Sequence, residues 1–308
     1  MKIAVMGSGG VGGYFGARLA KGGADVHFVA RGAHLDAMRR DGIAIEGGPD
    51  PIQVARVNAT DDPQEIGVAD IVLFAVKLWD TQDALELIRP MVGPDTAVVS
   101  FQNGVRKDEY LTAAYDPRQV MGGVTYVATT VDRPGVIRQT GTMQRLVFGE
   151  FDGVRSPRAE ALLEACKAGR INAEISPDIR REIWEKYVFL VGLSGTTTSM
   201  RTTIGPIREN PRTRAFLRDV MAEVVAVGRA HGVAFDPDYV DKRLAHADAL
   251  PFEMTSSMHH DFERGNRLEV PWLSGGVAEL GRKVGVPTPL NRAVADILAL
   301  HADGRKGA

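Results

Sequence analysis

The sequence contains a single cysteine, no long apolar run and almost no net charge. Cys166 cannot form a disulfide within the chain, and a lone cysteine excludes the cysteine spacings of zinc sites. No stretch approaches the roughly 20 apolar residues of a membrane-spanning helix. The formal net charge is −2, so no electrostatic argument favours nucleic acid or an anionic membrane as a partner.

No signal peptide is predicted either, because the apolar part of MKIAVMG is too short. We therefore expect a cytoplasmic protein. The residue that the chain has in quantity is glycine, with 34 copies, in a composition of 44% apolar and 25% charged residues that is typical of globular proteins. Its 308 residues are too many for one ordinary core and indicate two domains.

The first half of the chain alternates short apolar runs with helical stretches. Strands are predicted at 2–6, 25–31, 69–77 and 96–104, with helices at 10–23 and near 80–90. Nearly continuous apolar strands that alternate with helices indicate a parallel sheet covered on both faces. Between residues 119 and 150, strands separated by Pro-Gly and Gly-Thr turns are expected to extend this sheet in antiparallel fashion.

Helices are predicted to dominate after about residue 176. Their starts are marked by a polar capping residue followed by proline, at Ser176–Pro177, Asn210–Pro211, Asp236–Pro237 and Thr288–Pro289. The predicted fold class is α/β, a doubly wound sheet at residues 1–176 followed by an all-helical domain at residues 177–308.

A glycine-rich segment, GSGGVG, follows the first predicted strand and opens the first predicted helix. It fits the pattern G-x-G-x-x-G, in which Gly7 allows a tight turn, Gly9 lets a diphosphate approach the backbone, and Gly12 lets the helix pack closely. The positive end of the helix dipole then faces the phosphates. We expect a dinucleotide to bind Gly7, Ser8, Gly9, Gly10, Val11 and Gly12; the alternative is a glycine-rich turn without a ligand.

The residue that ends the second predicted strand distinguishes the two nicotinamide cofactors. An acidic residue there would favour NAD, whereas this chain has Arg31, whose guanidinium can pair with the 2′-phosphate of NADPH. Lys77 and Asn103 end the next two strands, at the sheet edge where ligands of such folds bind. The alternatives are that Arg31 and Lys77 are surface residues without a ligand and that Asn103 belongs to a simple turn.

In its motifs the chain resembles the ketopantoate reductase (2-dehydropantoate 2-reductase) family. The residues that carry the resemblance occur in the family's order over nearly the whole chain: the glycine loop, Arg31, VK at 76–77, QNG at 102–104, EIWEK at 182–186, and SSM at 256–258 followed by Glu269. The resemblance implies a Rossmann domain and a helical domain, NADPH, and reduction of a 2-keto acid in pantothenate biosynthesis. It also implies that Lys186 and Glu269 are catalytic and that Asn103 and Ser257 bind substrate.

Two departures from the family pattern concern the substrate. The family has asparagines four and eight residues after the lysine, where this chain has Leu190 and Ser194, and an acidic residue where it has Pro271. These changes leave the cofactor and proton chemistry intact but leave the identity of the keto acid open. Leu190 and Ser194 are therefore retained as candidate substrate-binding residues.

Helical periodicity places Lys186, Leu190 and Ser194 on one face, because residues four apart are neighbours. A hydride delivered to a ketone leaves an alkoxide, which an ammonium group can stabilise and then protonate. Periodicity alone equally allows a surface ion pair between Lys186 and Glu182, and the resemblance favours the general acid. Glu269 would hold the ammonium or bind the substrate.

Two other functions stay open: an NADP-dependent hydroxy-acid dehydrogenase with a different substrate, in which Lys186 is the base, and a non-catalytic NADPH-binding sensor. The presence of Lys186 together with Glu269 argues against the sensor. The adjacent His259 and His260 point to different sides of a helix, and we predict no metal site. A homodimer is compatible with the sequence, which does not decide the oligomeric state.

Overall fold

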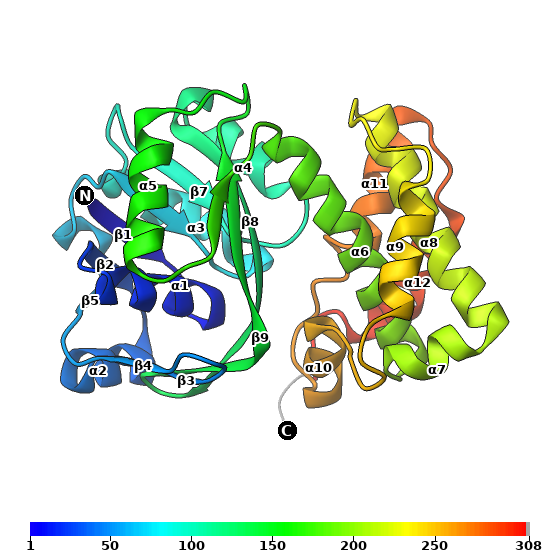
Figure 1. The fold of residues 1–308 in the computed structure, drawn as a ribbon, viewed down its shortest axis with the longest axis horizontal. Helices are drawn as coiled ribbons and strands as arrows, with labels where there is room; N and C mark the ends of the chain where they lie inside the picture. The colour runs from blue at the N-terminus through cyan, green and yellow to red at the C-terminus, as the bar shows by residue number, and fades with distance from the viewer. Residues whose placement is uncertain (306–308) are drawn as a thin grey trace. The chain divides into compact units, whose positions relative to one another are not determined.

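The computed structural model describes residues 1–305 and divides into two compact units, residues 1–182 and the residues from 183 onward. Each unit has its own architecture, and Figure 1 shows both. The first unit contains the sheet, and the second consists of helices. The predicted fold class, a Rossmann-type doubly wound sheet followed by an all-helical part, is confirmed.

One sheet of ten strands organises the first unit, in the order β4-β3-β9-β8-β7-β6-β1-β2-β5, with β10 paired to β9. The strands are β1 (Lys2–Met6), β2 (Asp25–Val29), β3 (Ile43–Gly47), β4 (Ile52–Val54), β5 (Asn58–Thr60), β6 (Ile71–Phe74), β7 (Ala97–Ser100), β8 (Val120–Arg133), β9 (Val136–Gly149) and β10 (Ala173–Ile175). The six strands from β5 to β8 are parallel and follow the 3-2-1-4-5-6 order of dinucleotide-binding folds.

Helices cover both faces of the parallel strands. They are α1 (Gly10–Lys21), α2 (Gly32–Asp41), α3 (Thr81–Leu87), α4 (Lys107–Ala114) and α5 (Pro157–Ala168). Alternate residues of β1 enter two different cores: Ile3 and Val5 pack with α1, α2 and α5, whereas Ala4 and Met6 pack with α3 and α4. A strand that is buried on both faces must be apolar throughout, and the run KIAVM meets that requirement.

The region from 120 to 149 differs from the prediction in one respect. β8 and β9 form a single antiparallel hairpin joined at Pro134–Gly135, and Gly135 has a φ of 77°. The Gly141–Thr142 pair is not a turn between strands. It lies within β9, where the register with β8 shifts between the pairs Val127↔Gln144 and Thr129↔Gln139. The extra residues are therefore absorbed as an irregularity inside a long strand.

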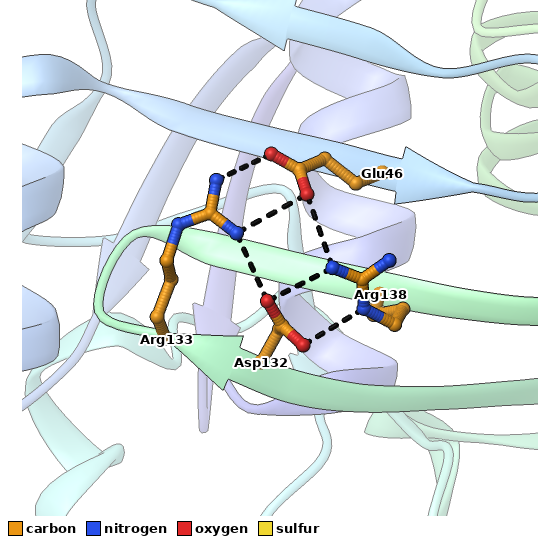
Figure 2. Close-up of polar contacts among 4 residues, drawn as sticks. All are labelled: Glu46, Asp132, Arg133 and Arg138. Carbon is orange, nitrogen blue, oxygen red and sulfur yellow. Dashed lines mark hydrogen bonds and ion pairs between the residues drawn. The ribbon is translucent and has the colours of Figure 1, made fainter.

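A network of four charged residues attaches the tip of this hairpin to β3 (Figure 2). Arg133 and Arg138 each pair with both Glu46 and Asp132, and the Arg138 Nε–Asp132 Oδ1 distance is 2.8 Å. The hydrogen bond from Arg138 lowers the pKa of Asp132 to about 2. These side chains are partly exposed, so the network orients the hairpin more than it stabilises the fold.

The second unit is built from α6 (Ile179–Met200), which crosses the division, and from α7 (Ile204–Glu209), α8 (Pro211–Ala230), α9 (Tyr239–Asp248), α10 (Ser257–Arg264), α11 (Ser274–Val284) and α12 (Pro289–Leu298). Its core forms around α6: a Cβ at Gly192 would lie 2.5 Å from the Met221 side chain of α8. No helix within residues 1–305 is long and apolar enough to cross a membrane.

Two of the four predicted helix starts are confirmed, and two are wrong by two residues. α8 begins at Pro211, and Asn210 accepts a hydrogen bond from the Arg212 amide, as expected. α12 begins at Pro289, but its first amides are capped by Glu223 of α8 and not by the Thr288 side chain. α6 and α9 begin at Ile179 and Tyr239, beyond the predicted Ser176–Pro177 and Asp236–Pro237, because Asp178 and Asp238 occupy their capping positions.

Candidate functional site

The glycine loop between β1 and α1 is closed at its ends and open in its middle. Gly7 has a φ of 95°, and a Cβ there would lie 2.8 Å from the amide of Val76. A Cβ at Gly12 would overlap with the carbonyl oxygen of Gly7. A Cβ at Gly9, by contrast, would meet no described atom within 4 Å. The open side at Gly9, ahead of a helix whose first turn carries no acidic residue, suits a phosphate group.

The side chains of Ser8 and Val11 are engaged within the protein. Ser8 is 4% exposed, and its hydroxyl donates to the carbonyl of Val29 at the end of β2, at 2.9 Å. Val11 packs against the hydrophobic core. The Ser8 hydroxyl is therefore engaged as a donor within the protein, and the Val11 side chain is only partly exposed. Gly10 lies under the carbonyl oxygen of Thr129 in β8, which would be 2.6 Å from a Cβ at this position.

Arg31 is the N-cap residue of α2, with extended backbone angles, and its side chain is exposed. It makes no ion pair with any residue of the described chain, whereas Arg39 and Arg40 of the same helix pair with Asp61 and Asp41. The guanidinium of Arg31 is therefore exposed near the end of β2, and its pairing with a 2′-phosphate stays a prediction.

Lys77 and Asn103 follow β6 and β7, the two strands next to β1 on one side. Since β1, β6 and β7 are parallel, their carboxyl ends lie at the same sheet edge, and this edge brings together the glycine loop, Lys77 and Asn103. Lys77 is exposed, with its Nζ 5.4 Å from the ring centroid of Trp79. Asn103 is half-buried and precedes Gly104, which has a φ of 85°.

Gln102 links these two loops; it belongs to the QNG motif at 102–104, but sequence reasoning assigned it no role. Its Nε2 donates to the carbonyl of Val76 at 3.0 Å and to the hydroxyl of Thr81 at 2.9 Å. The side chain is 7% exposed. Gln102 therefore holds the loop that carries Asn103 against the loop that carries Lys77. The sequence signal was the QNG motif, which begins two residues after β7 ends at Ser100.

A buried ion pair closes the same loop on its other side. Lys107 is 2% exposed, and its Nζ donates to the carbonyls of Ser100 and Gly123, both at 3.0 Å, and to Asp108 Oδ1 at 3.1 Å. Burial lowers the pKa of Lys107 and raises that of Asp108. The ammonium joins the ends of β7 and β8, so the segment from 101 to 106 is held at both ends. In the sequence, RKDE resembles a solvated charge run.

In the helical unit, α6 carries Lys186, Leu190 and Ser194 at four-residue spacing, as predicted. Lys186 and Leu190 are half-buried, and Ser194 is 0% exposed. The Ser194 hydroxyl has no hydrogen-bond partner within the described chain, and the same is true of Thr198 one turn later. An unpaired buried hydroxyl costs roughly 1–3 kcal/mol of stability. Such a cost is expected at positions that serve function, and Ser194 is a candidate substrate-binding residue.

Glu269 lies in the segment before α11 and is 7% exposed. Its carbonyl accepts from the amides of Trp272 and Leu273, which form a tight turn. The hydroxyl of Tyr187, the residue after Lys186, donates to the carbonyls of that same turn, at 2.9 Å for Trp272 and 2.8 Å for Leu273. Tyr187 therefore ties the Glu269 segment to the helix that carries Lys186, a contact that sequence reasoning missed.

A second tie joins α6 to the start of α10. Ser256 caps α10 by accepting from the His259 amide at 3.1 Å, and its hydroxyl lies 3.1 Å from that of Thr197 in α6. Ser257, the candidate substrate residue, is the first residue of α10 and is exposed. His259 is buried against Thr255, and burial lowers its pKa. The described residues contain no cluster of three or more potential metal ligands.

The sheet order and the open glycine loop at the end of its first strand define a Rossmann-fold dinucleotide-binding protein. Two models of one known protein family match this chain. The model described as "Ketopantoate reductase PanE/ApbA" matches residues 3–153, and "Ketopantoate reductase PanE/ApbA C terminal" matches residues 178–302. The chain belongs to the ketopantoate reductase family.

Individual relatives agree with this assignment. A protein named 2-dehydropantoate 2-reductase from Mesorhizobium japonicum is 36% identical, with 96% of this chain and 95% of that protein covered. An uncharacterized oxidoreductase, YkpB of Bacillus subtilis, is 32% identical over 98% of this chain and 99% of that protein. The crystal structure of a PanE/ApbA family ketopantoate reductase from Ralstonia eutropha matches with a TM-score of 0.89 at 32% identity, covering 98% of both chains.

The predicted family and enzyme class are thus confirmed. Family members are NADP-dependent oxidoreductases that act on CH–OH groups. The observed glycine loop fits such a cofactor. Side chains at Gly7 and Gly12 would collide with the protein, whereas a side chain at Gly9 would meet open space. Gly9 is the residue that is predicted to face the diphosphate.

Proposed function

We propose that this protein reduces a 2-keto acid to a 2-hydroxy acid with NADPH, and that Lys186 is the general acid. The observation that carries the proposal is the tie through Tyr187, which holds the Glu269 segment to α6 directly beside Lys186. A lysine and a buried glutamate on joined elements suit acid catalysis better than they suit a surface ion pair. The name of the Mesorhizobium relative, 2-dehydropantoate 2-reductase, supports the same reaction class.

In this proposal, residues 1–176 form the cofactor-binding domain. The backbone of Gly7 to Gly12 holds the diphosphate, Arg31 holds the 2′-phosphate, and Lys77 and Asn103 contact the cofactor from the neighbouring strand ends. NADPH, when bound, supplies the hydride. The fixed loop from 101 to 106 gives Asn103 a defined position.

Residues 177–308 form the substrate and catalytic domain in the proposal. The ammonium of Lys186 stabilises the negative charge that develops on the substrate oxygen and donates a proton to it. Glu269 holds that ammonium in place or binds the substrate. Ser257, exposed at the start of α10, and Asn103 bind the carboxylate or a hydroxyl of the keto acid.

The preferred keto acid is proposed to be more apolar than ketopantoate. Leucine neither donates nor accepts a hydrogen bond, whereas an asparagine does both, so Leu190 leaves a substrate hydroxyl unpaired at roughly 1–3 kcal/mol. Ser194 is fully buried and is much smaller than asparagine. Both differences disfavour the terminal hydroxyl of ketopantoate.

A panel of 2-keto acids, followed by the loss of NADPH absorbance, tests the reaction and its substrate together. We expect turnover with apolar keto acids and weak turnover with ketopantoate. The double variant Leu190→Asn/Ser194→Asn should shift kcat/KM toward ketopantoate. A wild-type kcat/KM for ketopantoate above about 10⁴ M⁻¹s⁻¹ would contradict the substrate proposal, and NADPH binding without turnover of any keto acid would favour a sensor.

The cofactor proposal has its own test. Arg31→Ala should weaken NADPH binding by roughly ten- to a hundredfold, because a charge-assisted pair contributes roughly 1.5–3 kcal/mol, and should leave NADH binding unchanged. Arg40→Ala is the matched control, since Arg40 lies on the same helix and pairs with Asp41. Equal wild-type affinities for NADPH and NADH would refute the assignment of Arg31.

A further inference from the structure

His34 bridges the glycine loop and the β8–β9 turn. Its Nε2 lies 2.9 Å from the carbonyl oxygen of Ser8, and the amide of Gly135 donates to its Nδ1 at 3.1 Å. Because Nδ1 accepts a hydrogen bond, it carries no proton. The proton of the neutral ring must then be on Nε2, which donates to Ser8. Both ring nitrogens are used, and the ring is neutral.

The two elements joined by His34 also meet elsewhere. The carbonyl of Thr129 in β8 covers Gly10 at the start of α1, and the carbonyl of Gly135 accepts from the Ala44 amide of β3 at 2.9 Å. The four-residue ion network ties the same hairpin tip to β3 (Figure 2). His34 therefore holds the glycine loop against a hairpin that is itself anchored.

His34 lies near the start of α2, close to Arg31. It is the third residue of the helix, in the turn for which Arg31 is the N-cap. A bond from His34 to Ser8 thus sets the distance between the first turn of α2 and the glycine loop. Removing the imidazole would leave the loop tied to the end of β2 through Ser8 and Val29, but no longer to the first turn of α2.

We propose that His34 is a positioning residue that determines cofactor preference: by holding the first turn of α2 to Ser8, it places Arg31 so that one dinucleotide reaches both the glycine loop and the guanidinium. The inference rests on the proposed function, in which NADPH binds these two elements. NADH needs only the loop. Loss of the bridge should therefore weaken NADPH binding more than NADH binding.

Protonation should open the bridge. Burial lowers the pKa of His34 from 6.5, and the hydrogen bond to Ser8 offsets part of that effect. The charged groups on the bridged elements are Arg31, Asp36, Arg39, Arg40 and Asp41 at or within α2 and Asp132, Arg133 and Arg138 beside the turn, and the glycine loop has none. A second ring proton on Nδ1 abolishes acceptance from Gly135. Both hydrogen bonds of the bridge are present when the pH is above 6.5, the ordinary pKa of histidine. The bond from Gly135 is lost as the pH falls through the lowered pKa of His34 in the folded protein.

Fluorescence titration of NADPH and NADH into the full-length protein tests the inference. His34→Ala should weaken NADPH binding by about tenfold and NADH binding by less than about threefold. His34→Gln, whose side-chain amide can both donate and accept a hydrogen bond, should keep the preference for NADPH over NADH that His34→Ala loses. His27→Ala is the matched control, because the His27 ring pairs with Asp25 at the start of β2.

Acidification provides a second measurement if His34→Ala does not fold. The 2′-phosphate itself gains a proton near about pH 6, so the comparison is between wild type and His34→Gln at each pH from about 8 to 5. Wild type should lose NADPH preference more steeply than His34→Gln. An unchanged NADPH-to-NADH ratio in His34→Ala, or parallel pH curves, would overturn the inference. Wild type without NADPH preference would instead refute the proposed cofactor.

Discussion

The two units differ in how they treat the polar groups beside their candidate residues. In the first unit, the side chains of Ser8, His34, Gln102 and Lys107 are all hydrogen-bonded to neighbouring backbone. In the helical unit, Tyr187 and Ser256 are bonded in the same way, but the buried hydroxyls of Ser194, Thr198 and Ser274 have no such partner among residues 1–305. In the first unit, the Thr129 hydroxyl near Gly10 is the exception that lacks one.

The difference separates a fixed surface from an adjustable one. Hydrogen bonds that hold loops in one geometry prepare a site for a ligand of constant shape, such as a dinucleotide. Unpaired buried hydroxyls cost stability, and departures of this kind are expected where function is served. The proposed function assigns cofactor recognition to the first unit and substrate variation to the helical unit, and four experiments test this contrast.

The largest effect is expected for Lys186→Ala. Loss of the proposed general acid should lower kcat by roughly 10²–10⁴ while NADPH binding, which the proposal assigns to the first unit, stays within about twofold. Lys242→Ala is the control, because Lys242 is a lysine of α9 that pairs with Asp236 and Asp238 at the surface. Near wild-type turnover in Lys186→Ala would reduce Lys186 to a surface residue.

The next effect concerns stability. Lys107→Met should lower the free energy of unfolding by roughly 3–5 kcal/mol, because it leaves the Asp108 carboxylate buried without its partner. Lys167→Met removes an exposed pair with Glu164 and should change it by less than about 0.5 kcal/mol. Urea unfolding measures both. Equal, small effects would show that the first unit does not depend on its buried polar bonds.

A smaller effect of opposite sign is expected in the helical unit. Ser194→Ala and Thr198→Val each remove an unpaired buried hydroxyl and should leave the free energy of unfolding unchanged or raise it by about 1 kcal/mol. Only Ser194→Ala should also lower kcat/KM for the preferred keto acid. Destabilisation by both variants would mean that these hydroxyls do have hydrogen-bond partners in solution, and the contrast between the units would fail.

The smallest effect should come from the surface network. Asp132→Asn removes a carboxylate whose pKa is lowered from 3.8 to about 2 by its hydrogen bond to Arg138. A carboxylate whose pKa is lower in the folded state than in the unfolded state stabilises the fold at pH values above its unfolded-state pKa. That contribution is lost as the pH falls toward the folded-state pKa of about 2. The urea midpoints of wild type and Asp132→Asn should therefore differ slightly at neutral pH and converge in acid. A constant difference would exclude the ionised pair as its cause.

Several features of the molecule follow from the sequence by itself. The apolar run KIAVM and the glycine spacing at Gly7, Gly9 and Gly12 determine a buried strand, a tight turn and a close helix, because each depends on neighbouring residues. The four-residue spacing of Lys186, Leu190 and Ser194 likewise determines a shared helix face. These are local regularities, and a repeat of 2 or 3.6 residues is visible in the chain.

Which distant groups meet depends on the packing of the whole chain. Lys107 bonds to Gly123, Tyr187 to Leu273, and His34 to Gly135, 101 residues away. Nothing in the local pattern distinguishes Lys107 from a solvated lysine or Tyr187 from a core tyrosine. Their partners are backbone groups, which every residue carries, so only the packing of the elements selects which carbonyl or amide comes within hydrogen-bond distance.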